Sequence, residues 1–461
     1  MNDAVPRIPG HFLFGSLPAF KSDRVNFLVD IPERYGDQCE MRLGLFFRVV
    51  VLSAPELARE VLIEQEDAFV KSLGLSVFAR PLLGNGLLTS EGDVHRRQRR
   101  LSAPAFMKQR ISGYADTIAE FTDRHVERLR GTDRVDLSEE MMRLTFEIVG
   151  KTLFNADVSG DVAVVEAALT AAMENLIAQT SSLIPLPPAV PSPANLRVKR
   201  LVEKLDDVMY RLIRDRRDSK NDEGDFLSML LIARDEDGTG AMTDRQVRDE
   251  AMTILLAGHE TTANALAWTF YLLAQNPAVR ERLHAEVDAV LEGRRPTLDD
   301  LPRLPYSLQV FKEAMRLYPP AYMMLRRATR SVKIGKVDLR KGDMVLVNII
   351  GMHRRADYFA NPTRFDPDRF APEAEKKLPK HAYLPFGAGP RICIGNHFAL
   401  MEGQIALAHL AQHLSFDLVP GREVVVPEPL ITLRPRGGLP MRVRPRAVRV
   451  AAPAPDVAAH A

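Results

Sequence analysis

One stretch of the sequence, residues 243–276, constrains the fold more than any other. It reads TDRQVRDEAMTILLAGHETTANALAWTFYLLAQN, with Thr243 and Gln246 in the spacing of a capping box at its start and a proline directly after Asn276. The pattern predicts one helix over residues 244–275, and at about 1.5 Å per residue such a helix is about 48 Å long. Because its middle is apolar on nearly every side, we expect it to cross the molecule at the centre of a helical body.

Helical patterns cover most of the remaining sequence, and strand patterns are few. Helix-like periodicity is found at residues 113–130, 137–154, 162–180, 196–217, 245–290 and 397–414. Strand-like patterns occur at residues 40–53, 331–349 and 430–445, and the pair Gly437-Gly438 in the last predicts a hairpin turn. The expected fold class is therefore mainly α, with a small β region beside a helical body.

The composition predicts one folded domain. The chain has 461 residues, of which 46% are hydrophobic and 26% are charged, and no Gly/Ser linker divides it. We expect a single domain over residues 1–446 and a disordered, low-complexity tail over residues 447–461. A formal net charge of +2 argues against a nucleic-acid-binding protein. The proline-rich stretch 181–195 is either a rigid connector or a lid over an apolar pocket.

Cysteine content and hydropathy predict a soluble, cytoplasmic protein. Cys39 and Cys393 are the only cysteines, which is too few for a disulfide framework. The N-terminal segment lacks the apolar core of a signal peptide, and we find no run of about 18 apolar residues that would span a membrane. We therefore expect no membrane anchor.

Cys393 lies in an unusual loop, PFGAGPRICIGN, residues 385–396. A structural cysteine is normally buried within a periodic helix or strand, whereas this one is surrounded by glycines that allow the backbone to approach a flat ligand closely. The next residues begin a helix, whose N-terminus would stabilise a thiolate. A thiolate there is a nucleophile or a metal ligand. His381 and His397 are the nearby bases, and neither completes a recognisable nucleophile motif.

Five residues of this loop carry a resemblance to a known family. They are Phe386, Gly389, Arg391, Cys393 and Gly395, in the arrangement F-x-x-G-x-R-x-C-x-G. The arrangement resembles the haem-binding loop of the cytochrome P-450 monooxygenases, and it implies that Cys393 is the axial thiolate ligand of the iron of heme b. The haem would lie between the long helix and the cysteine loop. The resemblance also implies that Phe386 packs near the sulfur, that the backbone at Gly387 approaches the cofactor and that Arg391 pairs with a haem propionate.

The long helix carries AGHETT, residues 257–262, which is similar to the oxygen-pocket stretch of the same family. The resemblance implies that Thr261 and Glu260 are catalytic, with the hydroxyl holding a water and the carboxyl relaying protons from solvent. The family's helix is distorted at this place, and Gly258 removes bulk there. Without the cysteine loop, a threonine that bonds a carbonyl one turn back would be the ordinary interpretation.

A second helix, around GDVHRRQRRLSAPAF, resembles the family's propionate-binding helix. His95 and Arg99 lie four residues apart and therefore share one helix face, from which both can bind one carboxylate. The spacing of later motifs favours Arg326 over the adjacent Arg327 as a further propionate ligand.

Another resemblance concerns structure and not chemistry. Glu313 and Arg316 in EAMR, with Arg369 in FDPDRF, are similar to the family's Glu-Arg-Arg network. The resemblance implies that this network supports the cysteine side of the fold. We assign no function to Cys39.

The function expected is insertion of one oxygen atom from O2 into a lipophilic substrate, with electrons from a separate partner. The chain has no flavin, iron–sulfur or dinucleotide-binding motif, so a ferredoxin or flavodoxin with its NAD(P)H reductase is implied. Basic residues near the two haem-binding motifs would form a docking face for an acidic partner, or are ordinary surface charges. They are Arg96, Arg97, Arg100, Lys376, Lys377 and Lys380.

Two other functions stay open at this point. Some relatives use peroxide or isomerise hydroperoxides, but those typically lack the acid–alcohol pair that Glu260 and Thr261 supply. A haem-binding gas sensor needs no such threonine.

The expected substrate pocket is apolar. Its lining, by resemblance, is Leu256, Ala257, Ala321, Met324, Leu325 and Ile431. No charged anchor is evident among them, so we expect a sizeable lipophilic substrate of the fatty acid, terpenoid or steroid class.

Overall fold

The computed structural model describes residues 5–44, 47–180, 182, 186–219, 224–233 and 240–447. The α-helices are α1 (Leu17–Ser22), α2 (Arg24–Tyr35), α3 (Pro55–Arg59), α4 (Arg80–Leu83), α5 (Gly92–Ser102), α6 (Lys108–Ser112), α7 (Ala115–Arg130), α8 (Leu137–Phe154), α9 (Val162–Thr180), α10 (Pro193–Ser219), α11 (Phe226–Ile232), α12 (Asp244–Gln275), α13 (Pro277–Leu291), α14 (Pro305–Leu317), α15 (Ile349–His353), α16 (Pro372–Glu375) and α17 (Asn396–His413).

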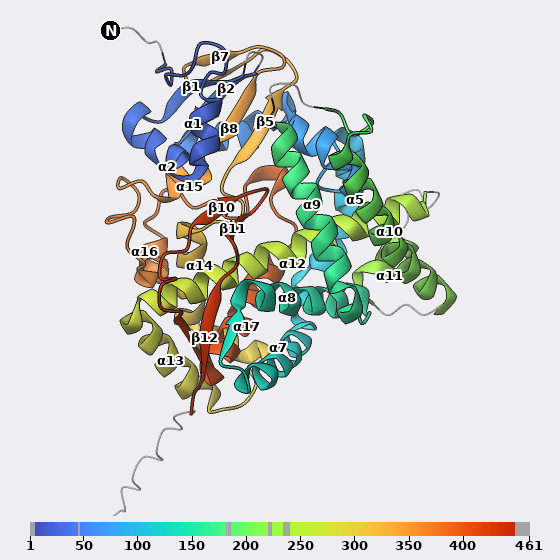
Figure 1. The fold of residues 1–461 in the computed structure, drawn as a ribbon, viewed down its shortest axis with the longest axis vertical. Coiled ribbons are helices and arrows are strands. Elements are labelled where there is room, and N and C mark those ends of the chain that lie inside the picture. The colour runs from blue at the N-terminus through green and yellow to red at the C-terminus, as the bar shows by residue number, and fades with distance from the viewer. Residues whose placement is uncertain are drawn as a thin grey trace, which may run out of the picture.

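The strands are short. They are β1 (Gln38–Leu43), β2 (Phe47–Leu52), β3 (Phe69–Lys71), β4 (Arg134–Asp136), β5 (Met324–Ala328), β6 (Val332–Ile334), β7 (Val337–Leu339), β8 (Met344–Val347), β9 (Leu414–Leu418), β10 (Pro427–Pro429), β11 (Leu433–Pro435) and β12 (Pro440–Pro445). Figure 1 shows the sheet of β1, β2, β5 and β8 with α1 and α2 at one end of the molecule, and the helical body beyond it. The predicted fold class is confirmed.

The central helix α12 spans residues 244–275, as the sequence predicts. Both bonds of its capping box are present, from the Gln246 backbone N–H to Thr243 Oγ1 (3.3 Å) and from the Thr243 N–H to Gln246 Oε1 (2.9 Å). It crosses the helical body and packs against α8, α10, α14 and α17 (Figure 1). The periodicity over 245–290 covers two helices, because Pro277 cannot supply the N–H that would continue α12.

The main sheet has the strand order β1-β2-β8-β5-β3, in which β2 and β8 are parallel and the other pairs are antiparallel. All four residues of β8 are buried, which explains their continuous apolar run. Pairing of Lys71 in β3 with Arg326 in β5 brings a basic edge of this sheet toward the cysteine loop.

The predicted hairpin at Gly437-Gly438 is wrong. Both glycines have positive φ (71° and 82°), so the chain does turn there. However, β11 pairs with β10, whereas β12 pairs with β4 and β9. The chain turns at these glycines, but β11 pairs with the strand just before it, and β12 pairs with strands from elsewhere in the sequence.

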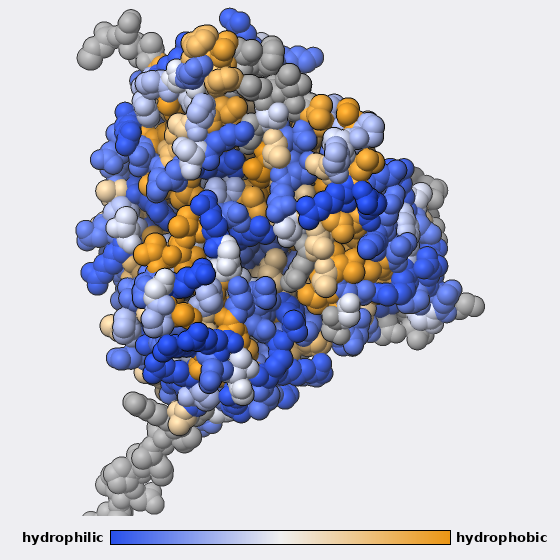
Figure 2. All heavy atoms as spheres, viewed as in Figure 1, coloured by the Kyte–Doolittle hydropathy of each residue, from blue (hydrophilic) through white to orange (hydrophobic). Residues whose placement is uncertain are grey.

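In the described part of the chain, one helix could cross a membrane as judged by its length and composition alone. It is α9, over Val162–Gln179. The sequence interpretation did not anticipate it, because Glu166 and Glu174 interrupt the apolar run. The helix packs against α10, and a core helix of a water-soluble protein passes the same test. Apolar side chains reach the surface over α9 (Figure 2).

Two predicted segments fall largely or partly outside the described residues. Of the expected tail, residues 448–461 lie outside them, as do residues 181 and 183–185 of the proline-rich stretch. The described part of that stretch is held by Asn195, whose amide nitrogen donates to the carbonyls of Pro187 (3.0 Å) and Val190 (2.9 Å).

Candidate functional site

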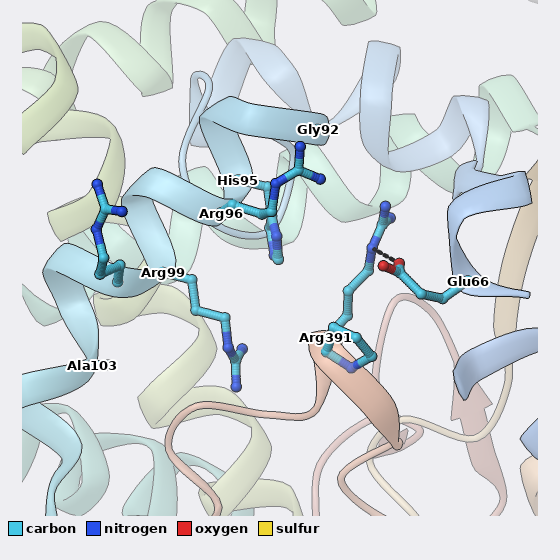
Figure 3. A pocket seen from close by; sticks show the side chains of 9 residues that line it. Glu66, Gly92, His95, Arg96, Arg99, Ala103 and Arg391 are labelled. Carbon is cyan, nitrogen blue, oxygen red and sulfur yellow. Dashed lines mark ion pairs between the residues drawn. The ribbon is translucent and has the colours of Figure 1, made fainter. Parts of the chain in front are cut away.

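Helix α5 presents a basic face to the cysteine loop. Figure 3 shows His95 and Arg99 extending from α5 toward the loop that carries Arg391, whereas Arg96 extends away from it. The space between them is a cavity of about 300 Å³. Its lining residues are Glu66, Gly92, His95, Arg96, Arg99, Arg100, Ala103, Pro390 and Arg391.

The electrostatics of this cavity favour an anion. Burial, together with the charges of Lys71, Arg391, Arg99 and Arg326, lowers the pKa of His95 to about 4, so the ring is neutral and donates through one N–H. Burial also lowers the pKa of Arg99. Neither side chain has a hydrogen-bond or ion-pair partner among the described residues, and partially buried cations without a counter-ion are unfavourable unless an anion joins them.

The alternation of β5 decides which of two adjacent arginines faces this region. Met324 packs with the cluster that includes the cysteine-loop residues Leu384 and Ala388, and a Cβ at Gly387 would lie 3.5 Å from Met324 Sδ. Arg326 is two residues from Met324 and therefore points to the same side, whereas Arg327 points to the other. The preference for Arg326 agrees with this geometry.

Arg391, which is also expected to pair with a propionate, lies beside two acidic residues. Its guanidinium is already paired with two carboxylates of the chain, Glu91 (2.7 Å) and Glu66 (3.5 Å). Among the arginines predicted to bind a propionate, Arg99 and Arg326 are those that have no acidic partner in the described structure. Arg391 therefore supplies less net positive charge to the cavity than the sequence interpretation assumes.

The cysteine loop is shaped by glycines and closed by backbone bonds. The Cys393 N–H donates to the carbonyl of Phe386 (2.9 Å). Gly387 and Gly389 have φ of 71° and 73°, and a Cβ at Gly389 would lie 2.1 Å from the carbonyl oxygen of Leu62. Gly395 needs no such freedom, since its φ is −93°.

The sulfur of Cys393 is both accessible and surrounded by protein. Its side chain is exposed, yet burial raises its pKa, while the Gly395 N–H and the charge of Arg99 lower it. Water can therefore reach the Cys393 sulfur although protein surrounds it. We infer that the sulfur lines an interior space. Cys39, by contrast, is fully buried, and burial raises the pKa of its thiol to about 12.

Helix α12 is buried over nearly its whole middle but has one accessible place. Ala257 is exposed and Thr261 is half-buried, and these two residues are one turn apart on the same face. Thr261 Oγ1 donates to the carbonyl of Ala257 (2.8 Å). The helix is continuous here, without the distortion that the resemblance implies. A Cβ at Gly258 would lie 3.2 Å from Val149 Cγ2, so this glycine allows α8 to pack closely against α12.

Glu260 is not a solvent-exposed relay. Its side chain is buried and accepts a hydrogen bond from Thr432 Oγ1, and burial raises its pKa to about 7. Thr432 was missed from the sequence, because nothing in the local pattern connects it with α12. The two residues are 172 positions apart.

A second buried carboxyl was also missed. Glu402 on α17 is fully buried and lies beside Thr262 of α12, and burial raises its pKa to about 8. Glu260, Thr261 and Thr262 are thus directed to three different surroundings.

The other predicted residues have the following places. Glu313 pairs with Arg316 (2.6 Å) and Arg369 (3.4 Å) in a buried network, as the resemblance implies. Leu256 lies in the helical core, away from the accessible face of α12. Ala321, Met324, Leu325 and Ile431 are all partly exposed.

Comparison with known proteins identifies the family. The sequence model of the family described as Cytochrome P450 matches residues 6–440. The chain therefore belongs to the cytochrome P450 family.

Relatives extend over nearly the whole chain. Cyclooctatin synthase of Streptomyces melanosporofaciens is 39% identical over 427 residues, which cover 92% of this chain and 91% of the relative. Cyclooctat-9-en-7-ol 5-monooxygenase of the same organism is 37% identical and covers 94% of both chains. Pentalenene oxygenase of Streptomyces avermitilis is 33% identical over 85% of this chain and 86% of its own. The protein is accordingly an oxidoreductase, a haem-dependent monooxygenase that uses O2, a lipophilic substrate and a redox partner.

Proposed function

We propose that this monooxygenase oxidises a polycyclic terpenoid, with heme b held between α12 and the loop of Cys393. The observation that carries the proposal is the accessible place in the middle of α12, at Ala257 and Thr261, on a helix that packs against α17, the helix that follows the cysteine loop.

The residues present fit a haem. Cys393 offers a sulfur on the wall of an interior space, and a metal cation would stabilise its thiolate against the effect of burial. His95, Arg99 and Arg326 offer donors without acidic partners for the propionates. When bound, the haem supplies O2 activation and oxygen transfer.

Thr261 and Glu260 are the residues we assign to proton delivery. Thr261 stands at the accessible place and can exchange its bond with the Ala257 carbonyl for one with a water. Glu260 is the adjacent acid, and its pKa of about 7 allows it both to give and to take a proton near neutral pH.

The substrate class follows from the lining and from the relatives. Ala257, Ala321, Met324 and Ile431 are apolar and partly accessible, and none provides an anchor for a carboxylate. The names of the relatives point to cyclic alkenes and their alcohols. Within the predicted lipophilic classes, this favours a terpenoid over a fatty acid.

We further propose a ferredoxin as the electron donor and the cytoplasm as the location. Lys377 and Lys380 are exposed and precede the cysteine loop in the sequence, which supports an acidic partner. Arg96 and Lys376 contribute less, because each is paired with an acidic neighbour.

The test is a binding screen by the haem absorption shift. Pentalenene and cyclooctat-9-en-7-ol should bind more tightly than a long-chain fatty acid or a steroid, and turnover with a ferredoxin, its reductase and NADPH should give a mono-oxygenated product. Tight binding of the fatty acid alone would overturn the terpenoid assignment. Turnover with hydrogen peroxide but not with NADPH would favour the peroxide-using class.

A further inference from the structure

The hairpin of β10 and β11 is fixed to α12 by its tip, residues 430–432. Trp268 Nε1 donates to the carbonyl of Leu433 (2.9 Å), and the Tyr322 hydroxyl donates to the carbonyl of Leu430 (2.9 Å). Arg24 Nη1 binds the carbonyl of Pro429 (2.9 Å) and the Tyr322 hydroxyl (3.1 Å). The tip is therefore anchored by hydrogen bonds from distant parts of the chain.

Thr432 stands at this tip with a defined hydrogen-bond direction. Its hydroxyl oxygen accepts from Asn264 Nδ2 (3.2 Å) and its hydrogen is donated to Glu260 Oε1. When Glu260 is ionised its carboxylate can only accept, and the Asn264 amide nitrogen can only donate, so in that state the Thr432 hydrogen is directed at Glu260. Within the described structure, Thr432 is the side chain that hydrogen-bonds Glu260.

The surroundings of Glu260 contain one other charge that acts on it. Burial raises the pKa of Glu260, and the Thr432 hydroxyl and the charge of Arg434 lower it. Arg434 is itself paired with Glu428 (2.7 Å) on the same hairpin, which reduces its effect. His259, the neighbour on α12, is buried with its ring against Phe146 of α8, and burial lowers its pKa to about 4.

We propose that Thr432 is a positioning residue for proton delivery, which holds the carboxyl of Glu260 and stabilises its ionised form after each proton transfer. The proposal rests on the assigned roles of Glu260 and Thr261. When Glu260 gives up its proton, a carboxylate is left in a buried site, and the Thr432 hydroxyl is the donor aimed at it. Uptake of another proton by this carboxylate then restores the acid.

The direct test measures the carboxyl group and not activity. In the haem-loaded protein, the infrared C=O stretch of the protonated carboxyl is followed against pH and assigned by its loss in Glu260→Gln. In Thr432→Val, which keeps the shape and removes the hydroxyl, the pKa of this band should rise by about one unit, since a lost bond to the charged form disfavours it.

Two further variants separate a local effect from a structural one. Thr432→Ser should keep the wild-type pKa of the band. Thr269→Val is the matched control. Thr269 is a buried threonine like Thr432, but it belongs to α12 and its hydroxyl donates to the carbonyl of Ala265 (2.6 Å). If Thr432→Val does not fold, Thr432→Ala takes its place with the same expected shift.

The pH profile of turnover supplies a second readout. With pentalenene as the probe, the basic limb of kcat should move upward in Thr432→Val by the same amount as the infrared band. An unshifted band, or an equal shift in Thr269→Val, would overturn the proposal. The carbon monoxide spectrum of the same wild-type sample tests the proposed function separately from the role of Thr432. A thiolate-type band supports the proposed function, whether or not the Glu260 band shifts in Thr432→Val.

Discussion

At the scale of residues, three consecutive side chains of α12 have three separate tasks. Glu260 faces the hairpin tip, Thr261 faces the accessible place and Thr262 faces Glu402. Successive residues of a helix point about 100° apart, so one short motif serves three surroundings. The motif can therefore be tested one residue at a time.

Thr261→Ala should bind haem and substrate normally yet release much of the consumed oxygen as hydrogen peroxide. Two protons must reach the same oxygen atom in a pocket that excludes water, and the Thr261 hydroxyl is the group placed to order them. The measurement is product formed per NADPH oxidised, with peroxide quantified alongside. Thr262→Ala removes a hydroxyl on another face and should remain coupled. Full coupling in Thr261→Ala would remove this residue from the mechanism.

Arg99→Met should weaken haem retention by about tenfold or more, because a charge-assisted bond to a propionate contributes about 1.5–3 kcal/mol. Arg96→Met is the control, since Arg96 lies on the same helix but extends away from the loop (Figure 3). Haem transfer to apomyoglobin measures the loss. Equal rates for both variants would mean that Arg99 does not hold the cofactor.

At the scale of elements, the cysteine loop depends on how closely it packs against the segment at Leu62. Gly389→Ala combines an unfavourable φ with a Cβ that would lie 2.1 Å from a backbone oxygen, so the loop must move. Gly421→Ala has the same kind of φ, +80°, with nothing within 4 Å. We expect Gly421→Ala to cost about 1 kcal/mol of unfolding free energy and to keep its haem, and Gly389→Ala to cost more and to lose haem.

Thermal unfolding and the ratio of haem to protein absorbance distinguish the two glycine variants. If Gly389→Ala retains haem as well as Gly421→Ala does, the close packing of the loop is not what shapes the cofactor site.

Structure that depends on neighbouring residues is predicted well from the sequence. Contacts between segments far apart in the sequence are not. The capping box and the proline after Asn276 fix α12 to the residue, since both act within a few positions. The turn at Gly437-Gly438 was predicted but the pairing was not, because β12 finds β4 and β9. Burial of Glu260 and its bond to Thr432 depend on a contact across 172 positions, which no local pattern records.

At the scale of the whole molecule, the proposed haem site draws on both the helical body and the sheet. The body supplies α12, α5 and α17, and the sheet supplies β5 with Arg326. Glu313 and Arg316 form a buried ion pair, and the resemblance implies that their network supports the cysteine side. The proposed site is centred on Cys393, so the account depends above all on the role of its sulfur.

The most direct measurement is the carbon monoxide difference spectrum of the reduced protein with and without Cys393→Ser. The wild-type protein should show the red-shifted Soret band of a thiolate-ligated haem. Cys393→Ser should lose that band while it keeps its fold and, through His95, Arg99 and Arg326, much of its haem. An unchanged band in Cys393→Ser would contradict the account, because the ligand would then have to be the buried Cys39 or no thiolate at all.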